Sequence, residues 1–370
     1  MEENKKIKII FLGAYNTNEI LPGPHKVAKR IFEQYSKTNK TVFINYFQDG
    51  KKYSLFQKLF GSNIIDEVNG SPVIIMGIIT LMLYIIKWRP KIIHLLNYER
   101  FIIFAIFLKM ILRFKLFYTV NGIIAHENKY YNTDTRITVM KNIIVEYLLI
   151  NYSDLIFVLS GLSEVIIRNY YNVSKEKTIK TFNGIDDVFL DYRPINNEAI
   201  EKNSIVFIGD INRPQKGFAS LIYVLEKFDI EVNLHVIDSK FRLESICCNN
   251  VNIKINCWDK FKPKELKEFL VNKSVIVCPS EYDPFNISVL ESISCGLFPV
   301  ITKQTGVVEH IEKNIECKTY NCNDIEKLYQ ILKCIIEDKD FKRVDNSAYL
   351  RSLTWQCVLE KYCDKYKLYI

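Results

Sequence analysis

Short runs of β-branched and aromatic residues alternate with helical patterns along this chain of 370 residues. In the first half, the candidate strands are residues 7–12, 41–46, 92–94, 116–120 and 155–159, and helical periodicity marks residues 25–35 and 142–150. Continuous apolar strands separated by helices are typical of a parallel sheet that helices cover on both faces. The pattern therefore predicts an α/β protein.

The same alternation restarts after residue 200. Candidate strands are residues 204–208, 232–237, 251–255, 274–278, 298–301 and 317–320. Chains longer than about 250–300 residues tend to divide into domains, so we expect two Rossmann-like, doubly wound sheets in tandem. Turn-forming residues at 183–187 indicate a join within residues 181–194.

Charge is unevenly distributed between the two halves. The net charge is +8, but residues 1–180 hold 25 basic and 14 acidic side chains, whereas the remainder holds 25 and 28. A basic half suits an anionic surface such as a phospholipid face, and a general solubility charge is the alternative. Because no Lys/Arg-rich run carries interleaved aromatic residues, nucleic acid is not expected as a partner.

The cysteines and the amino-terminal residues indicate the compartment. All 10 cysteines lie after residue 246, and none forms a Cys-x-x-Cys pair. Cysteines used as small buried hydrophobes are typical of a reducing compartment. Residues 1–13 have neither the length of a signal-peptide apolar region nor a cleavage site, so a cytoplasmic protein is expected.

Two long apolar stretches occur in the basic half. Residues 73–86 are followed by Lys87, Trp88 and Arg89, and residues 101–112 are interrupted by Lys109. Both are shorter than the roughly 20 residues of a membrane-spanning helix. Since they are apolar nearly all round, they are expected to be helices enclosed between a sheet and other helices, and a membrane-seated face is the alternative.

Ligands of open parallel sheets bind beyond the carboxyl ends of the strands. Here those ends lead into the loops at residues 13–26, 121–127, 209–217, 256–264, 279–286 and 302–308. Two facing sheets would form a cleft between these loops.

Residues 278–300 carry the most informative local pattern. A strand is followed by a turn and by a helix that begins near Asn286 and ends at Gly296, with Asp283 before the helix and Glu291 inside it. The first-turn amides, from Phe285 through Ile287 to Ser288, would form an anion site suited to phosphate. Two carboxylates beside such a site are suited to accept hydrogen bonds from sugar and ribose hydroxyls.

This segment resembles the acidic-x7-Glu signature of the retaining glycosyltransferases of family 4, which have the GT-B fold. Five further segments resemble the family in the same order along the chain, namely residues 116–122, 153–160, 181–186, 205–221 and 355–366. The resemblance implies an acceptor-side domain at residues 1–182, a donor-binding domain at 183–352, and a terminal helix at 353–370 that crosses back to the first domain.

The resemblance also implies roles for individual residues. Glu291 would bind the nucleotide ribose, and Asp283, where the family usually has Glu, would bind the donor sugar. Lys216 and Arg213 would neutralise the diphosphate, although Arg213 is displaced from the usual position. Gly23 resembles the glycine loop that approaches the diphosphate from the first domain, with a plain turn as the alternative. Asn286 stands where the family often has glycine.

The largest departure from the family is Asn121, which stands where many members have a histidine close to the transferred sugar. His126 and Glu127 follow on the same loop and are candidates for positioning the acceptor hydroxyl, or else form surface contacts. The family's retaining reaction needs no strong protein nucleophile, because the leaving phosphate can accept the proton. No metal-ligand spacing occurs, so no cofactor and no metal are expected.

The sequence thus predicts a retaining glycosyltransferase that moves a sugar from a nucleotide-sugar to a glycan or lipid-linked acceptor in cell-surface polysaccharide or glycoconjugate synthesis. Two alternatives remain. A non-catalytic GT-B partner in a glycan-assembly complex would explain Asn121 and Asp283, and an inverting GT-B transferase would use His126 as its base. The basic first domain is further expected to associate peripherally with the inner face of the membrane.

Overall fold

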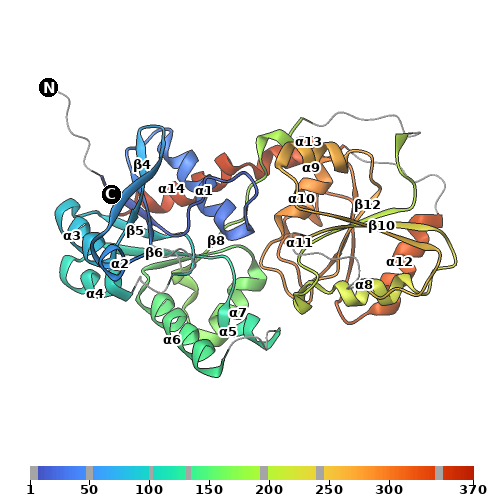
Figure 1. Ribbon diagram of the computed structural model, residues 1–370, viewed down its shortest axis with the longest axis horizontal. Helices are drawn as coiled ribbons and strands as arrows, with labels where there is room; N and C mark the ends of the chain where they lie inside the picture. The colour runs from blue at the N-terminus through green and yellow to red at the C-terminus, as the bar shows by residue number, and fades with distance from the viewer. Residues whose placement is uncertain are drawn as a thin grey trace.

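The structure is a computed structural model that describes residues 7–46, 53–99, 103–130, 135–191, 199–238, 246–337 and 345–370. Within these residues the chain forms two α/β domains that lie next to each other along the long axis of the molecule (Figure 1). Each domain is a largely parallel sheet with helices on both faces. The predicted two-domain α/β architecture is confirmed. Residues 192–194 of the predicted join lie outside the described residues.

The first sheet has the strand order β3-β4-β2-β1-β5-β6-β7-β8, and only β3 runs antiparallel to its neighbour. Its strands are β1 (Ile9–Leu12), β2 (Val42–Tyr46), β3 (Ser62–Val68), β4 (Ser71–Met76), β5 (Ile92–Leu95), β6 (Lys115–Val120), β7 (Leu155–Val158) and β8 (Thr178–Lys180). Its helices are α1 (Gly23–Ser36), α2 (Leu55–Phe60), α3 (Ile78–Trp88), α4 (Ile103–Leu112), α5 (Ile124–Glu127), α6 (Arg136–Tyr152) and α7 (Gly161–Tyr171).

The second sheet is parallel, in the order β11-β10-β9-β12-β13-β14. Its strands are β9 (Ser204–Ile208), β10 (Val232–Ile237), β11 (Ile253–Trp258), β12 (Val275–Cys278), β13 (Phe298–Thr302) and β14 (Lys318–Tyr320). The helices that follow β9 are α8 (Phe218–Leu225), α9 (Pro263–Leu270), α10 (Ile287–Ser294), α11 (Val308–Ile311), α12 (Ile325–Glu337), α13 (Ser347–Leu350) and α14 (Trp355–Tyr366).

Side chains alternate between the two faces of each strand and so build two cores around the first sheet. Phe11 and Phe117 belong to the core that also contains α1 and α14, whereas Ile10 and Leu116 belong to the core beneath α3, α4, α6 and α7. Because both faces are covered, the central strands are buried along their whole length. This explains why they read as continuous apolar runs in the sequence.

The terminal helix α14 crosses back from the second domain and packs against α1, as predicted (Figure 1). Tyr366 and Tyr362 are buried from this helix against the first sheet, and the Tyr366 hydroxyl lies 2.6 Å from Nδ1 of His94. The other ring nitrogen of His94 lies 2.9 Å from the hydroxyl oxygen of Thr119. Burial lowers the pKa of His94 to about 3, so this histidine is a neutral structural residue.

The prediction of one long helix at residues 73–86 is wrong. Residues 73–76 belong to strand β4, and α3 begins after Gly77. A Cβ atom at position 77 would lie 2.5 Å from the backbone of Leu59, so the glycine permits a close chain crossing that separates the two elements. Strands β3 and β4 form a hairpin around Asn69 and Gly70, which both have positive φ angles, and the sequence analysis missed this hairpin.

The expectation that the two apolar helices are enclosed is also wrong. Helices α3 and α4 bury one side against the first sheet, but Leu83 of α3 is 59% exposed and Met110 of α4 is 69% exposed. Residues 101–102 of the second apolar stretch lie outside the described residues. Among the helices that the structure describes, none is long and apolar enough to cross a membrane.

Candidate functional site

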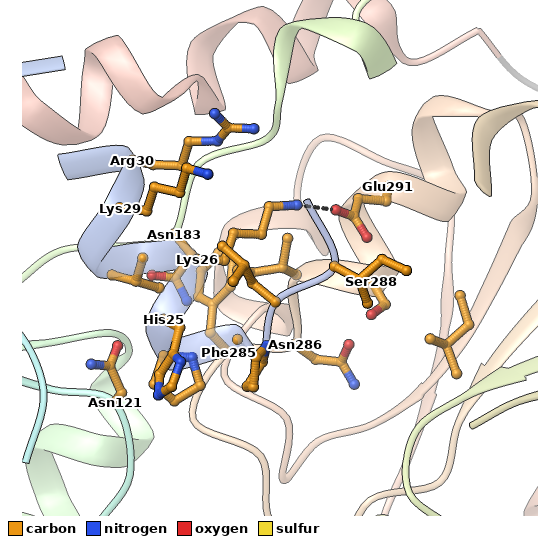
Figure 2. Close-up of a pocket in the computed structure, with 18 of the residues that line it drawn as sticks. His25, Lys26, Lys29, Arg30, Asn121, Asn183, Phe285, Asn286, Ser288 and Glu291 are labelled. Atoms are coloured by element: carbon orange, nitrogen blue, oxygen red, sulfur yellow. Dashed lines mark hydrogen bonds and ion pairs between the residues drawn. The ribbon is translucent and has the colours of Figure 1, made fainter. Parts of the chain in front are cut away.

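A cleft of about 1410 Å³ lies between the two domains, where the loops after the parallel strands face one another (Figure 2). The loop before α1 and the residues after β6 line one wall, and the loops after β9 and β12 line the other. Pockets for single small ligands are usually about 300–1,000 Å³, so this cleft has room for more than one substrate. Its position is the one predicted from the strand-to-helix loops.

Helix α10 begins at the second wall after a residue with an unusual backbone conformation. Asn286 precedes the helix with a φ angle of 65°, in the left-handed region that glycine adopts readily and asparagine tolerates. The family often has glycine at this position. The left-handed backbone conformation explains why glycine or asparagine is found here. Ile287 and Ser288 form the first turn of the helix, whose amides have no acceptor inside the helix and border the cleft.

Phe285 does not contribute its amide as predicted. The Phe285 N–H donates a hydrogen bond to Oδ1 of Asp283 at 3.2 Å, and the Phe285 side chain is buried. Asp283 therefore shapes the turn before α10 as well as facing the cleft. The predicted anion site is reduced to the amides that follow Phe285.

Lys216 and Asp283 form an ion pair on the donor-side wall. Nζ of Lys216 lies 2.6 Å from Oδ2 of Asp283, and both side chains are largely buried. Burial alone would lower the pKa of Lys216, but the Asp283 carboxylate outweighs this effect and raises it, so the lysine stays charged. Gly217 makes this approach possible, since a Cβ atom there would lie 1.9 Å from the carbonyl oxygen of Pro279 and its φ angle is 69°.

Glu291 forms an ion pair with a lysine of the first domain. Nζ of Lys26, in the first turns of α1, lies 2.5 Å from Oε1 of Glu291 and 3.0 Å from Asp186 (Figure 2). Both carboxylates are about nine-tenths buried or more. Burial alone would lower the pKa of Lys26, but the two carboxylates raise it. The ammonium group therefore links α1, α10 and the interdomain segment.

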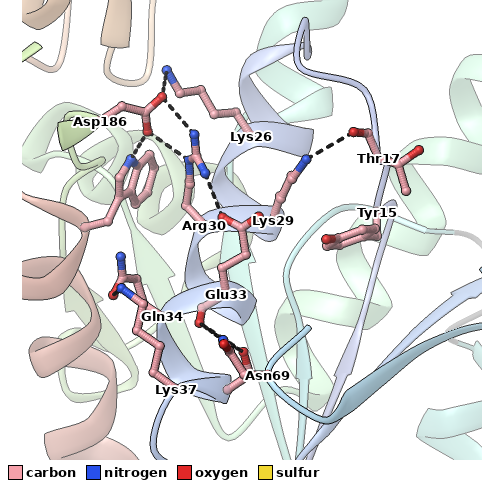
Figure 3. Close-up of polar contacts among 12 residues, drawn as sticks. Tyr15, Thr17, Lys26, Lys29, Arg30, Glu33, Gln34, Lys37, Asn69 and Asp186 are labelled. Carbon is pink, nitrogen blue, oxygen red and sulfur yellow. Dashed lines mark hydrogen bonds and ion pairs between the residues drawn. The ribbon is translucent and has the colours of Figure 1, made fainter. Parts of the chain in front are cut away.

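Asp186 is the centre of this network (Figure 3). Besides Lys26, it accepts hydrogen bonds from Arg30 at 2.9 and 3.1 Å and from the indole N–H of Trp355 at 2.8 Å. Burial would raise its pKa, but the two cations lower it, so the carboxylate is ionised. The network connects α1, the interdomain segment and α14 next to Glu291, the predicted ribose-binding residue.

Arg213 and Gly23 also line the cleft, from opposite walls. The Arg213 side chain is about half exposed and lies 3.6 Å from Asp210. Gly23 is the first residue of α1, and a Cβ atom there would meet nothing within 4 Å. Packing within the chain therefore does not require a glycine at position 23.

Asn121 lines the acceptor-side wall of the cleft. Its amide group donates a hydrogen bond to the carbonyl oxygen of Leu96 at 2.7 Å, and a carbonyl can only accept, so the orientation of the side chain is fixed. Oδ1 is buried and has no hydrogen-bond partner within the described chain. Asn121 thus keeps an unused hydrogen-bond acceptor in the wall of the cleft.

Glu127 also lines the cleft and is held close to Gly122. A Cβ atom at position 122 would lie 2.4 Å from Oε1 of Glu127. Burial raises the pKa of Glu127 to about 7, with Arg213 acting against this shift and Asp283 adding to it. Residues of both walls therefore influence the charge of this carboxyl group near neutral pH.

His126 is not among the residues that line the cleft. Its ring packs against Tyr282, with 4.6 Å between ring centroids, and against Tyr130 and Tyr170. Burial lowers its pKa. The contact with Tyr282 joins the α5 segment to the second domain, and His126 is not placed in the cleft lining where its predicted role requires it.

The sequence analysis missed three residues of the site. His25 and Lys26 line the cleft from the start of α1, and Asp186 lines it from the interdomain segment. Their partners are distant in the sequence, as with Lys26 and Glu291, which are 265 positions apart. The available signals were the loop at residues 13–26, which was expected to face the cleft, and the family-like segment 181–186 that ends at Asp186.

In the part of the chain that the structure describes, no group of three or more His, Cys, Asp or Glu side chains is arranged to hold a metal ion. The charged groups of the cleft are instead paired with one another, as Lys216 is with Asp283 and Lys26 with Glu291.

Comparison with known proteins supports this description of the fold and of the second domain. Residues 189–350 match the model of a family described as "Glycosyl transferases group 1". The match covers most of the second domain. It contains all the predicted donor-side residues from Arg213 to Glu291.

Two solved structures resemble the chain over nearly its whole length. HepE of Anabaena, solved in complex with UDP and glucose, is 15% identical and has a TM-score of 0.70, covering 98% of this chain and 99% of that one. Sucrose-phosphate synthase of Thermosynechococcus elongatus is 14% identical and has a TM-score of 0.74, covering 97% and 98%. The fold is therefore GT-B, as the resemblance implied.

One curated relative matches over a shorter region. Alpha-maltose-1-phosphate synthase of Mycolicibacterium smegmatis is 23% identical over 241 residues, which is 57% of this chain. The match spans 62% of that relative, which is less than two thirds of its length.

Proposed function

We propose that this protein is a retaining glycosyltransferase of family 4 that moves a sugar from a UDP-sugar to a hydroxyl of a glycan or lipid-linked acceptor. The observation that carries the proposal is the donor-side wall, where Asp283 and Glu291 flank the start of α10 and Lys216 lies 2.6 Å from Asp283. This arrangement suits a nucleoside diphosphate with a sugar at one end and a ribose at the other. UDP as the nucleotide is supported by the ligand of HepE.

The reaction breaks the bond between the anomeric carbon of the donor and the diphosphate oxygen. The acceptor hydroxyl forms the new bond on the same face, and its proton passes to the departing phosphate oxygen. Lys216 and Arg213 would stabilise the negative charge that develops on the diphosphate. Glu127 and the Oδ1 atom of Asn121 would orient hydroxyl groups at the other wall.

The inverting alternative loses its candidate base, since the ring of His126 packs on Tyr282 outside the cleft lining. The non-catalytic alternative keeps the support of Asn121, which cannot act as a base. Turnover separates this alternative from the main proposal, because both predict nucleotide binding. Free thiols at all ten cysteines suit the reducing conditions of the cytoplasm, but the expectation of buried cysteines holds only for Cys278 and Cys295.

A panel of UDP-, GDP- and ADP-sugars tests the proposal. We expect UDP and one UDP-sugar to raise the thermal melting midpoint and the sugar to be released slowly into water. Proton NMR of the first product should show the anomer of the donor. Folded protein that binds no member of the panel contradicts a donor site, and the opposite anomer contradicts retention.

Removal of divalent cations is expected to leave activity unchanged. Lys216 and Arg213 provide the positive charge that a metal ion supplies to a leaving diphosphate in other enzymes. The check is the rate of UDP-sugar hydrolysis in EDTA compared with the rate in added magnesium. If hydrolysis stops in EDTA and resumes with magnesium, the positive charges of Lys216 and Arg213 do not suffice to stabilise the leaving diphosphate.

Replacement of Glu127 is expected to change the pH dependence of transfer. With a pKa of about 7, the carboxyl group is protonated below neutral pH and ionised above it, so activity that needs the carboxylate should rise with pH through 7. In Glu127→Gln, kcat should fall by about ten- to a hundred-fold, as for a lost positioning group, and the step near pH 7 should disappear. Glu265→Gln, at an exposed residue of the same cleft, is the control. A step that persists in Glu127→Gln would assign it to another group.

A further inference from the structure

Helices α3, α4 and α6 form a continuous outer layer on the first domain, with α3 contacting α4 and α4 contacting α6 (Figure 1). Their inner sides belong to the core beneath the first sheet. Their outer sides carry large apolar side chains that are each more than half exposed, including Leu83, Phe107, Met110, Ile111, Ile137 and Met140. We call this surface the α3–α4–α6 face. Large exposed apolar patches of this kind mark interaction sites.

The exposed charged side chains in or directly after the three helices have one sign among the described residues. Exposed cations lie in or directly after the three helices, at Lys87, Arg89, Arg113, Arg136 and Lys141. Helices α3 and α4 contain no acidic residue, and the single one of α6, Glu146, is fully buried. Lys109 is not counted, because it is paired with Asp154.

We propose that the α3–α4–α6 face docks on a bilayer that contains anionic lipids. Apolar side chains at the centre would enter the interface between headgroups and acyl chains, while the surrounding cations contact the headgroups. A second copy of this chain fits less well, since a two-fold contact would bring the same five cations against each other. The charge therefore favours a lipid surface over self-association.

Helix α6 connects this face to the acceptor-side wall of the cleft. On its inner side, Glu146 accepts hydrogen bonds from the amides of Ile124 and Ala125, at 2.7 and 3.0 Å, and so anchors the α5 segment that carries Glu127. Tyr98, which lines the cleft, hydrogen-bonds to Asn142 of α6. If the proposed transfer holds, docking would bring a lipid-linked acceptor to the wall that Glu127 and Asn121 form.

Vesicle sedimentation of the full chain tests the docking surface. The probes are vesicles of phosphatidylcholine alone and of phosphatidylcholine and phosphatidylglycerol in equal parts. We expect binding only to the mixed vesicles, with a decrease as salt shortens the Debye length below about 8 Å. The double variant Phe107→Ser, Met110→Ser should lower binding at least tenfold, and Lys87→Gln with Arg113→Gln should weaken it mainly at low salt.

Val251→Ser is the matched control, since Val251 is an exposed apolar residue of the second domain. All of these side chains are exposed, so the melting midpoint should stay near that of the wild type. Equal binding to neutral vesicles, no binding to anionic vesicles at low salt, or a dimer that the double variant dissociates would each overturn the proposal. UDP-sugar hydrolysis, measured without lipid, reports separately on the proposed transfer.

Discussion

Glu291→Gln is expected to lower the affinity for UDP by about ten- to a hundred-fold, because hydrogen bonds to a charged acceptor contribute about 1.5–3 kcal/mol and 1.4 kcal/mol is tenfold. Glutamine keeps the volume of the side chain but loses the charge and one acceptor. The effect should be equal for UDP and uridine, since both carry the ribose. Isothermal titration calorimetry with the two ligands measures it.

A deoxyribose ligand makes this test specific to the assigned contact. The wild type should bind UDP more tightly than 2′-deoxy-UDP, and Glu291→Gln should bind the two alike. Folding should be affected little, because Lys26 keeps its second partner, Asp186, at 3.0 Å. Glu19→Ala removes an exposed carboxylate at the same cleft and is the control. A variant that still discriminates against deoxyribose would assign the ribose to another residue.

If Glu291 binds the ribose as proposed, Lys26 competes with that ribose for the same carboxylate. In this structure Lys26 joins Glu291 to Asp186, and Asp186 in turn binds Arg30 and Trp355 (Figure 3). A nucleotide whose ribose binds Glu291 must share that carboxylate with the ammonium group or displace it. With Glu291 in the proposed role, donor binding would be coupled to the contact that holds α1 against α10.

Most strands of both sheets could be predicted because they are buried on both faces and read as unbroken apolar runs, whereas the short edge strand β8 was missed. Every strand expected from the sequence is present, with its ends within three residues of the prediction. The missed β3–β4 hairpin is different, since β3 is an edge strand that is mostly exposed and has no apolar run. Its turn at Asn69 and Gly70 was the available signal.

The outer helices show where hydrophobic patterning stops being informative. A helix that is apolar all round is usually enclosed, and α4 has this pattern, yet Phe107 and Met110 are exposed. The pattern shows that both sides of the helix are apolar, but it does not show whether other parts of the protein cover the side that faces away from the sheet. In the site, similarly, Asp283 and Glu291 could be located from their spacing, whereas their partners Lys216 and Lys26 depend on how the two walls approach each other.

Lys216→Ala is expected to weaken UDP and UDP-sugar about ten- to a hundred-fold and to leave uridine nearly unchanged, because lysine acts as a point charge on phosphate. Glu291→Gln is instead expected to weaken UDP and uridine equally, so the two variants test different parts of one ligand. The measurement is again titration with UDP and uridine, together with the hydrolysis rate of the UDP-sugar.

The ion pair with Asp283 complicates the alanine variant, since it leaves a buried carboxylate without its cation and lowers stability. Lys216→Arg keeps the charge and should recover part of the UDP affinity. If Lys216 only stabilised the loop, keeping the charge would not restore the affinity for UDP. Lys262→Ala, at an exposed lysine of the same cleft paired with Glu19, is the matched control. An equal loss for UDP and uridine in Lys216→Ala would show that the wall has lost its shape, and the diphosphate contact would then have to be sought at Arg213.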